Sequence, residues 1–294
     1  MSKVWLVTGC SRGLGRAIAS AVADAGERLI ATARDPKDLQ PLVDAHPDHV
    51  RAVALDVTDS HAARAAVAAA VDNFGRLDVL VNNAGYANIG SFEDVSEADF
   101  RAQFEADFFG VVNVTKAALP VMRKQRAGHI IQISSIGGRG ASPGLSAYQS
   151  AKWAVGGLSG VIAKEVAPFG VHVTTVEPGG MRTDWAGSSM KVDDLAPDYR
   201  ETIGNYSKFL RGAPEVMRGD PRKIAQVILR LAEQKEPPLR LLIGTDAVFL
   251  AKLYLDQRRD EDAKWRAWSA STDFDGMPDF ATTPAAKRLE QGPP

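Results

Sequence analysis

Short apolar segments alternate with longer helical patterns along most of this chain of 294 residues. Several of the short segments are apolar almost throughout, as expected where helices cover both faces of a parallel sheet. The segments predicted as strands are residues 4–7, 28–33, 50–55, 79–81, 129–133, 171–176 and 240–243. The segments predicted as helices are residues 15–25, 36–45, 60–74, 97–126, 147–167 and 221–233. This alternation predicts a Rossmann-type, doubly wound α/β fold with a parallel sheet of about seven strands.

The length of the chain suits one large α/β domain and is short for two. Neither a Pro/Gly-rich linker nor an internal repeat divides the sequence, so we expect a single domain whose main body is residues 1–245. The segment from about residue 184 to residue 220 interrupts the alternation of strands and helices. A loop of that length predicts a lid over a binding site. Residues 246–294 are expected to form a helical or irregular extension whose aromatic side chains pack on the body or on a neighbour.

Charge and cysteine content exclude several classes of protein. A formal net charge of −1 gives no electrostatic reason to expect nucleic acid or a membrane surface as a partner. Cys10 is the single cysteine, which excludes an intrachain disulfide and suits a reducing compartment. His46 and His49 have a spacing that a metal site can use, but they lack acidic or thiol neighbours, so no metal is expected. The N-terminal segment lacks the apolar run of a signal peptide, and we expect a cytoplasmic protein.

A glycine-rich loop follows the first predicted strand and leads directly into a helix. Gly9, Gly13 and Gly15 permit a tight turn and a close approach of the backbone to a ligand. The free N–H groups of the helix that follows favour an anion. This arrangement predicts a pyrophosphate site of the kind that dinucleotide cofactors use.

A second group of polar residues follows the fifth predicted strand. Tyr148 and Lys152 are four residues apart, one helical turn, so they share a face of the predicted helix. An ammonium beside a phenol favours the phenolate, so we expect Lys152 to lower the pKa of Tyr148 and to suit it to proton exchange near neutral pH. Taken alone, this spacing also fits a solvated helix face.

With Ser135, thirteen residues before Tyr148, and the glycine loop, the chain resembles the short-chain dehydrogenase/reductase family over roughly residues 3–245. The motifs occur in the family's order as TGCSRGLG, Asp56-Val57, NNAG at residues 82–85, Ser135 with YQSAK, and Pro178-Gly179 with Thr183. The resemblance implies an NADP(H)- or NAD(H)-binding oxidoreductase. The cofactor-binding residues that it implies are Gly9, Ser11, Arg12, Gly13, Leu14, Gly15, Arg34, Asp56, Val57, Asn83, Ala84, Gly85, Tyr148, Lys152, Pro178, Gly179 and Thr183.

The resemblance also implies a role for each of three polar side chains. Tyr148 is the general acid in reduction and the general base in oxidation. Lys152 binds the nicotinamide ribose and acts on the pKa of Tyr148. Ser135 stabilises charge on the substrate oxygen, and the thirteen-residue spacing selects it over Ser134. The hydride belongs to the cofactor.

The end of the second strand indicates which cofactor is preferred. An NAD-binding chain usually has an acid there for the ribose 2′-hydroxyl, whereas this chain has Ala33 followed by Arg34. Arg34 and Arg12 suit a 2′-phosphate through charge-assisted contacts. Asp35 is the nearest acid, but it precedes Pro36 and is expected to cap the next helix. We therefore expect NADP(H) to be preferred, with NAD(H) possible.

One position departs from the family pattern. Where the family has an asparagine in an NxxG sequence, this chain has Asp107. Asn113 lies two turns further on and is not a substitute. A carboxylate at position 107 favours the ammonium form of Lys152. We expect an active enzyme with an altered pH profile; a weakened, cofactor-binding regulator is the alternative.

These features together predict an NADPH-dependent carbonyl reductase, or an alcohol dehydrogenase in the reverse direction. Met181, Trp185, Met190 and Leu195 suggest a hydrophobic carbonyl or alcohol substrate. An NAD-dependent dehydrogenase of secondary alcohols is the alternative function that the sequence allows. The family also implies a homo-dimer or homo-tetramer built on the two long helices.

Overall fold

The computed structural model describes residues 2–183, 194–212 and 217–290. Within these ranges, seven strands form one parallel sheet in the order β3-β2-β1-β4-β5-β6-β7. The strands are β1 Val4–Val7, β2 Arg28–Ala33, β3 Val50–Ala54, β4 Val79–Asn82, β5 Gly128–Ile133, β6 Val171–Pro178 and β7 Arg240–Ile243. The predicted Rossmann-type fold is confirmed.

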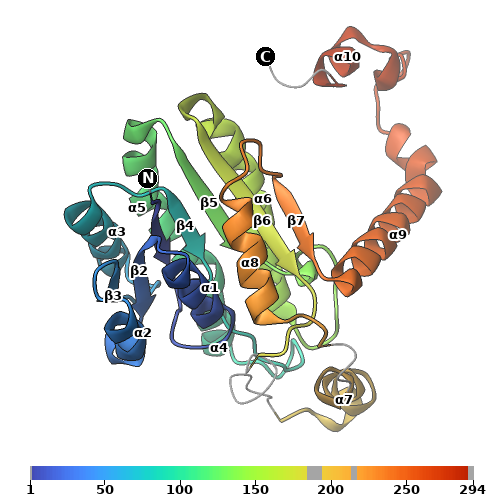
Figure 1. Ribbon diagram of the computed structural model, residues 1–294. Helices are drawn as coiled ribbons and strands as arrows, with labels where there is room; N and C mark the ends of the chain where they lie inside the picture. The colour runs from blue at the N-terminus through green and yellow to red at the C-terminus, as the bar shows by residue number, and fades with distance from the viewer. Residues whose placement is uncertain (1, 184–193, 213–216, 291–294) are drawn as a thin grey trace. The chain divides into compact units, whose positions relative to one another are not determined.

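Helices cover both faces of the sheet (Figure 1). One face packs against α1 and α8, and the opposite face packs against α3, α5 and α6. Along β1 the side chains alternate between these layers, with Trp5 and Val7 on the first and Val4 and Leu6 on the second. Both faces of β1 are therefore apolar, which explains its unbroken hydrophobic sequence. The α-helices are α1 Gly13–Asp24, α2 Gln40–Ala45, α3 Ser60–Phe74, α4 Glu97–Phe104, α5 Gly110–Gln125, α6 Ser146–Val166, α7 Asn205–Gly212, α8 Pro221–Leu231, α9 Thr245–Ala270 and α10 Pro284–Glu290.

The order of the strands reverses at the centre of the sheet. From β1 the chain moves outward to β2 and β3, and then returns to pair β4 with the other side of β1. The connections that leave the carboxyl ends of β1 and β4 diverge to opposite sides, which leaves a crevice above these strands. The fold therefore places its binding crevice where the glycine loop ends β1.

The helix predicted over residues 97–126 is present from Glu97 to Gln125, but it is not α-helical throughout. A π turn at Glu105–Phe109 separates α4 from α5, and Asp107 lies at its centre. Such a turn accommodates one extra residue, which a 3.6-residue periodicity does not reveal. The predicted helix over residues 36–45 likewise begins as a 3-10 turn, Pro36–Leu39, before α2.

The predicted lid is described in part. Residues 184–193 and 213–216, and with them Trp185 and Met190, lie outside the described residues. The described part contains the 3-10 turn Pro197–Tyr199, the π turn Arg200–Gly204 and α7.

The chain divides into two compact units, Met1–Ala251 and Lys252–Pro294, with the division inside α9. In the second unit Trp265 and Trp268 pack edge to face, with ring centroids 5.1 Å apart. The packing of these aromatic side chains on the body or on a neighbour stays a prediction.

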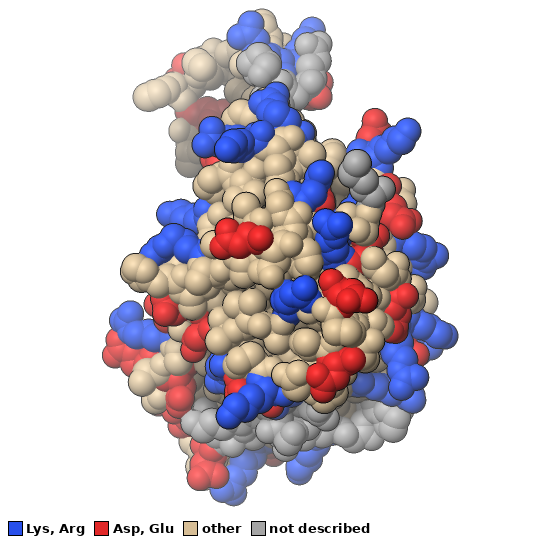
Figure 2. Space-filling model, turned by 60° about the vertical axis from the view of Figure 1, so that its left-hand side comes forward, with Lys and Arg blue, Asp and Glu red and all other residues tan. Residues whose placement is uncertain are grey.

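Surface charge is mixed over the face drawn in Figure 2, where Lys and Arg alternate with Asp and Glu among uncharged residues. No helix in the described ranges is long and apolar enough to span a membrane.

Candidate active site

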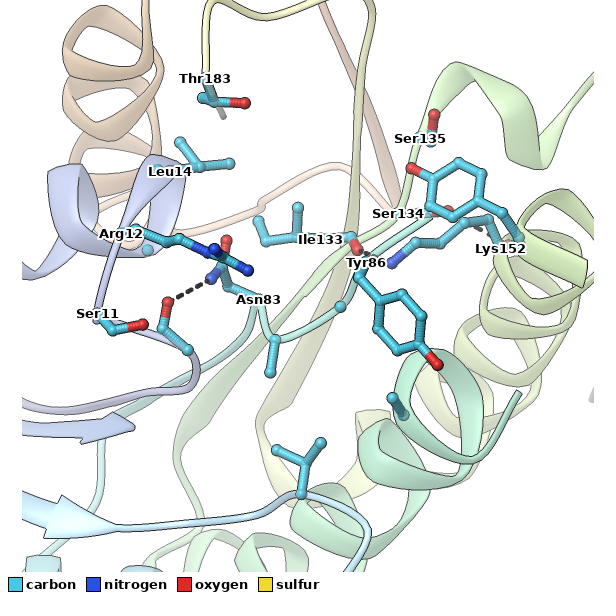
Figure 3. A pocket seen from close by; sticks show the side chains of 18 of the residues that line it. Ser11, Arg12, Leu14, Asn83, Tyr86, Ile133, Ser134, Ser135, Lys152 and Thr183 are labelled. Carbon is cyan, nitrogen blue, oxygen red and sulfur yellow. Dashed lines mark hydrogen bonds between the residues drawn. The ribbon is translucent and has the colours of Figure 1, made fainter. Parts of the chain in front are cut away.

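A cavity of about 650 Å³ lies at the carboxyl ends of the strands (Figure 3). Segments that follow β1 to β6 all contribute to its wall. The predicted site residues that line it are Gly9, Ser11, Arg12, Gly13, Leu14, Gly15, Arg34, Asp56, Val57, Asn83, Ala84, Gly85, Ser135, Tyr148, Lys152, Pro178, Gly179 and Thr183. Asp107 is the predicted residue that does not line the cavity; it lies behind the wall. We call the part of the cavity around Arg12, Arg34 and Asp56 the arginine end, and the part around Ser135, Tyr148 and Lys152 the tyrosine end.

The glycine loop is folded tightly enough to exclude side chains. Gly9 has a φ of +71° and Gly13 a φ of +58°, which glycine adopts without strain. A Cβ at Gly15 would lie 2.1 Å from the carbonyl oxygen of Gly9. Helix α1 then begins without a side-chain cap and without an acidic residue in its first turn. Its first N–H groups therefore remain available to an anion, and the loop fits the pyrophosphate of a dinucleotide.

The NNAG segment holds this loop against β4. The side-chain amide of Asn83 donates to the carbonyl oxygens of Thr8 and Gly9, at 2.9 and 3.3 Å. The hydroxyl of Thr8 in turn accepts from the backbone N–H groups of Asn83 and Ala84. Asn83 thus acts on the shape of the glycine loop as well as on the wall of the cavity.

The arginine end is open to solvent. Arg12 and Arg34 are exposed, and within the described residues their guanidinium groups form no hydrogen bond or ion pair. Figure 3 shows Arg12 extending into the cavity. The carboxylate of Asp35 accepts from the backbone N–H of Lys37 at 3.0 Å and begins the next turn, so the predicted capping role of Asp35 is confirmed. Two guanidinium groups with no bonding partner among the described residues, beside an acid that already caps a turn, fit a 2′-phosphate.

The segment after β3 completes the arginine end. Asp56 accepts from the backbone N–H and the hydroxyl of Thr58, at 3.0 and 2.8 Å, in a local turn. The side-chain amide of Asn113, in α5, donates to the carbonyl oxygens of Val57 and Thr58. Sequence reasoning gave Asn113 no role in this wall.

The tyrosine end is buried. Tyr148 and Lys152 are 8% and 4% exposed and lie on one face of α6, as their spacing predicted. The ammonium of Lys152 donates to the carbonyl oxygen of Ile133 at 3.1 Å and lies 5.6 Å from the centre of the Tyr148 ring. Ser135 accepts from the backbone N–H of Gly137 and forms a hydrogen bond with Tyr148. The three predicted catalytic side chains therefore meet at one point of the cavity.

Burial raises the pKa of Tyr148 above its ordinary value of 10. The hydrogen bond with Ser135 lowers this pKa, and the negative charge of Asp107 raises it further. The prediction of a lowered pKa is therefore wrong for the free protein. Desolvation of the phenolate is the largest cause, and the Lys152 ammonium donates to the carbonyl oxygen of Ile133.

Asp107 is completely buried behind Gly85. One oxygen, Oδ1, accepts from the backbone N–H of Tyr86 at 2.9 Å, and the other, Oδ2, has no hydrogen-bond partner among the described residues. A Cβ at Gly85 would lie 2.7 Å from Oδ1 and 3.4 Å from the Lys152 ammonium, so only a glycine fits between these groups. Burial raises the pKa of Asp107 to about 6, against the lowering effects of Lys152 and of the Tyr86 N–H.

Three features of the site were missed by sequence reasoning. Tyr86 lines the cavity directly after NNAG, and burial and the charge of Asp107 raise its pKa. Glu177, 2% exposed at the end of β6, accepts from Arg139 at 2.6 Å, in the loop that follows Ser135. Asp246 accepts from the backbone N–H of Gly180 at 2.8 Å. The available signal was position, because each lies at the carboxyl end of a strand or just after one, at the edge that carries the site.

Cys10 lies inside the glycine loop and is fully buried. Its thiol donates to the carbonyl oxygen of Val7, and burial raises its pKa to about 12. These properties suit a packing residue and not a nucleophile.

Comparison with known proteins agrees with this geometry. The family model described as short chain dehydrogenase matches residues 3–193, more than half of the chain. The protein named Oxidoreductase BOA17, from Botryotinia fuckeliana, is 51% identical over 92% of this chain and 100% of its own length. A crystal structure of a short-chain dehydrogenase from Streptomyces avermitilis superposes with a TM-score of 0.87 at 42% identity, over 93% of this chain and 99% of that one.

A second similar solved structure is a complex with a cofactor. It is a metagenomic short-chain oxidoreductase in complex with NADP, which superposes with a TM-score of 0.66 at 28% identity over 83% of this chain and 97% of that one. The matched motifs, the fold and these relatives agree. The chain belongs to the short-chain dehydrogenase/reductase family of oxidoreductases.

Proposed function

We propose that this protein is an NADP(H)-dependent oxidoreductase that moves a hydride between the nicotinamide and the carbon of a ketone, an aldehyde or a secondary alcohol. The observation that carries this proposal is one cavity that joins two sites. Its arginine end has two guanidinium groups that no other described residue binds, beside the glycine loop, and its tyrosine end has Ser135, Tyr148 and Lys152 close together.

The arginine end supports NADP(H) over NAD(H). Arg12 and Arg34 would bind the 2′-phosphate, while Asp35 caps the next turn through one carboxylate oxygen and does not line the cavity. The complex of a related oxidoreductase with NADP is consistent with this choice. NAD(H) is the alternative cofactor for the same cavity.

The tyrosine end supports carbonyl reduction. When bound, the cofactor supplies the hydride. The raised pKa of Tyr148 keeps its phenol protonated at neutral pH, so the residue is ready to donate its proton to the carbonyl oxygen as the alcohol forms. Ser135 holds the same oxygen, and the Lys152 ammonium stabilises the phenolate that remains. In the oxidative direction Tyr148 acts as the base, and its raised pKa opposes that step.

The surroundings of Tyr148 support an apolar substrate. Tyr148 packs in a cluster with Ala87, Ile89, Leu145 and Ile203, and Leu195 packs against the same cluster. Met181 lines the cavity itself. A hydrophobic ketone or aldehyde therefore suits the space beside the phenol.

We further propose a homo-dimer or homo-tetramer in the cytoplasm. Large apolar side chains lie exposed on α6 and at the end of the π turn before α5, with Trp153 at 38%, Phe109 at 43% and Val161 at 57%. A second copy of the chain is the partner that the family pattern implies for this surface. Light scattering with sedimentation tests the size of the assembly; a monomer at all concentrations would contradict it.

The proposed activity is tested by following NADPH and NADH oxidation against a panel of hydrophobic ketones and aldehydes. We expect turnover with NADPH, weaker turnover with NADH, and no turnover by Tyr148→Phe. If the purified protein binds NADPH but oxidises none across the panel, the proposal of an active reductase is wrong.

The presence of Asp107 supports a second candidate function, that of a weakened enzyme that serves as an NADP-binding regulator. Its buried carboxylate raises the pKa of Tyr148 and lies close to Lys152. A gain of orders of magnitude in turnover for Asp107→Asn would support that candidate, and a similar or lower turnover would exclude it.

A further inference from the structure

Asp246 lies outside the cavity but holds part of its wall. It is in the first turn of α9, directly after β7 and Gly244. Its oxygen Oδ2 accepts from the backbone N–H of Gly180 at 2.8 Å. Gly180 lies on the segment Pro178–Thr183, which lines the cavity except at Arg182. This segment follows β6, the neighbour of β5, and Ser135 follows β5.

The carboxylate of Asp246 is tightly packed between two glycines. A Cβ at Gly179 would lie 2.0 Å from Oδ2, and a Cβ at Gly244, whose φ is +104°, would lie 2.4 Å from Oδ1. Glycines on both sides of the carboxylate therefore admit it. Oδ1 is buried without a hydrogen-bond partner among the described residues, so the position of the side chain rests on its contact with Gly180.

Other contacts hold the same segment. The N–H of Gly179 donates to the carbonyl oxygen of Ile243 in β7, at 2.9 Å, and the carbonyl oxygen of Gly180 accepts from Gly219 at 2.8 Å. The end of the segment approaches the glycine loop, because Thr183 lies within 3.8 Å of a Cβ built on Gly13. Between these points, Asp246 is the side chain that fixes the direction of the Gly180 N–H.

We propose that Asp246 is a positioning residue for the cofactor: it fixes the Pro178–Thr183 wall in the orientation that receives the nicotinamide half, and it does not act on the adenosine half. This inference rests on the proposed function, since it assumes a nicotinamide dinucleotide in the cavity. The adenosine half would bind at the arginine end and the nicotinamide half at the tyrosine end, so the effect of a variant on each half can be measured separately.

The test compares two ligands by calorimetry on the full-length protein: NADP⁺, and adenosine 2′,5′-bisphosphate, which lacks the nicotinamide half. For Asp246→Ala we expect the Kd of NADP⁺ to rise at least about tenfold, the usual effect of losing a charge-assisted hydrogen bond. The Kd of the bisphosphate should stay within about twofold, because its binding groups are distant and independent. Asp246→Asn keeps an oxygen that accepts from Gly180, so its ratio of the two Kd values should stay near that of the wild type.

Asp78→Ala is the matched control. The carboxylate of Asp78 accepts from the backbone N–H of Val4 at the same 2.8 Å, but at the start of β4, at the opposite edge of the sheet. It should lower stability and leave the ratio of the two Kd values unchanged. If Asp246→Ala does not fold, Asp246→Ser replaces it, since a serine hydroxyl is too short to reach the Gly180 N–H.

The possible failures are distinguishable. If the wild type binds both ligands and the Asp246 variants keep its ratio, or weaken both ligands by one factor, this inference is overturned and the proposed function stands. If the wild type binds neither ligand, the proposed function is overturned and this inference with it.

Discussion

The two ends of the cavity are built in different ways. At the arginine end, Arg12 and Arg34 are exposed side chains on loops that follow adjacent strands. At the tyrosine end, Tyr148 and Lys152 of α6 are almost fully buried, and Asp107 is buried behind them in the π turn before α5. Charges at the first end act through water and are screened by salt, whereas at the second end desolvation decides which groups carry a proton. The same fold thus separates recognition of a charge from control of a proton.

The largest effect is expected at the tyrosine end. Tyr148→Phe removes the proton donor and should lower turnover about a thousandfold, within the range for loss of a general acid. The affinity for NADP⁺ should change little, because the arginine end is intact. Rapid mixing of enzyme-bound NADPH with a hydrophobic ketone measures the chemical step.

Tyr199→Phe is the control for this variant. It removes a phenol hydroxyl that donates to Glu93 at 2.9 Å on the surface. Its turnover should match the wild type. Equal turnover for Tyr148→Phe and the wild type would remove Tyr148 from the mechanism.

The next largest effect is expected on the pH dependence of stability, through the buried carboxyl group of Asp107. Asp107 has a pKa of about 6 in the folded protein against 3.8 ordinarily, so its contribution to stability is present below about pH 4 and is lost as the pH rises through 6. The loss corresponds to about 3 kcal/mol. Asp107→Asn does not titrate and should therefore gain stability relative to the wild type between pH 4 and pH 7.

Urea unfolding of both proteins at pH 4, 6 and 8 measures this difference. Asp44→Asn, at an exposed site on α2, should show no comparable trend. Parallel pH profiles for the wild type and Asp107→Asn would mean that Asp107 does not titrate in this range.

A smaller effect is expected at the arginine end. Arg34→Ala should raise the Kd of NADP⁺ about tenfold at low salt and leave the Kd of NAD⁺ unchanged. The difference should shrink as salt increases, in contrast with the effects at the buried end. Lys37→Ala, an exposed cation nearby that does not line the cavity, is the control. If Arg34→Ala lost affinity for NAD⁺ as well as for NADP⁺, Arg34 would not bind the 2′-phosphate specifically.

The smallest effect is expected for a residue that supports the arginine end from behind. Asn113→Ala removes the donor to the carbonyl oxygens of Val57 and Thr58 and should lower stability by about 1 kcal/mol. The affinity for adenosine 2′,5′-bisphosphate should fall a few fold, by the same reasoning. Asn73→Ala, which removes a side-chain bond to Ala69 on the surface of α3, should leave that affinity unchanged.

The sheet and most of the cavity were predictable because they depend on local signals. Apolar strands, a glycine loop before a helix and a Tyr–Lys pair one turn apart are each visible within a few residues. Their meeting in one cavity follows from the fold, since the ends of parallel strands share an edge. Asp35 is an example of such a local signal, because Pro36 alone indicated that Asp35 would cap a turn.

The rest depends on packing that the sequence does not display. The π turn around Asp107 adds one residue to a helix whose periodicity otherwise continues. The pKa of Tyr148 depends on how much water reaches it, and the spacing to Lys152 carries no information on that. Asp246 lies far in the sequence from Gly180, and only the position of β7 beside β6 brings them together.

The thiol of Cys10 can report chemically on the opening of the glycine loop. The thiol is the single one in the chain, it is fully buried, and its pKa of about 12 leaves almost no thiolate at neutral pH. A thiol reagent can therefore modify it only when the loop opens. The labelling rate of the native protein measures how often that happens, and a ligand that bridges the loop should slow it in proportion to its occupancy.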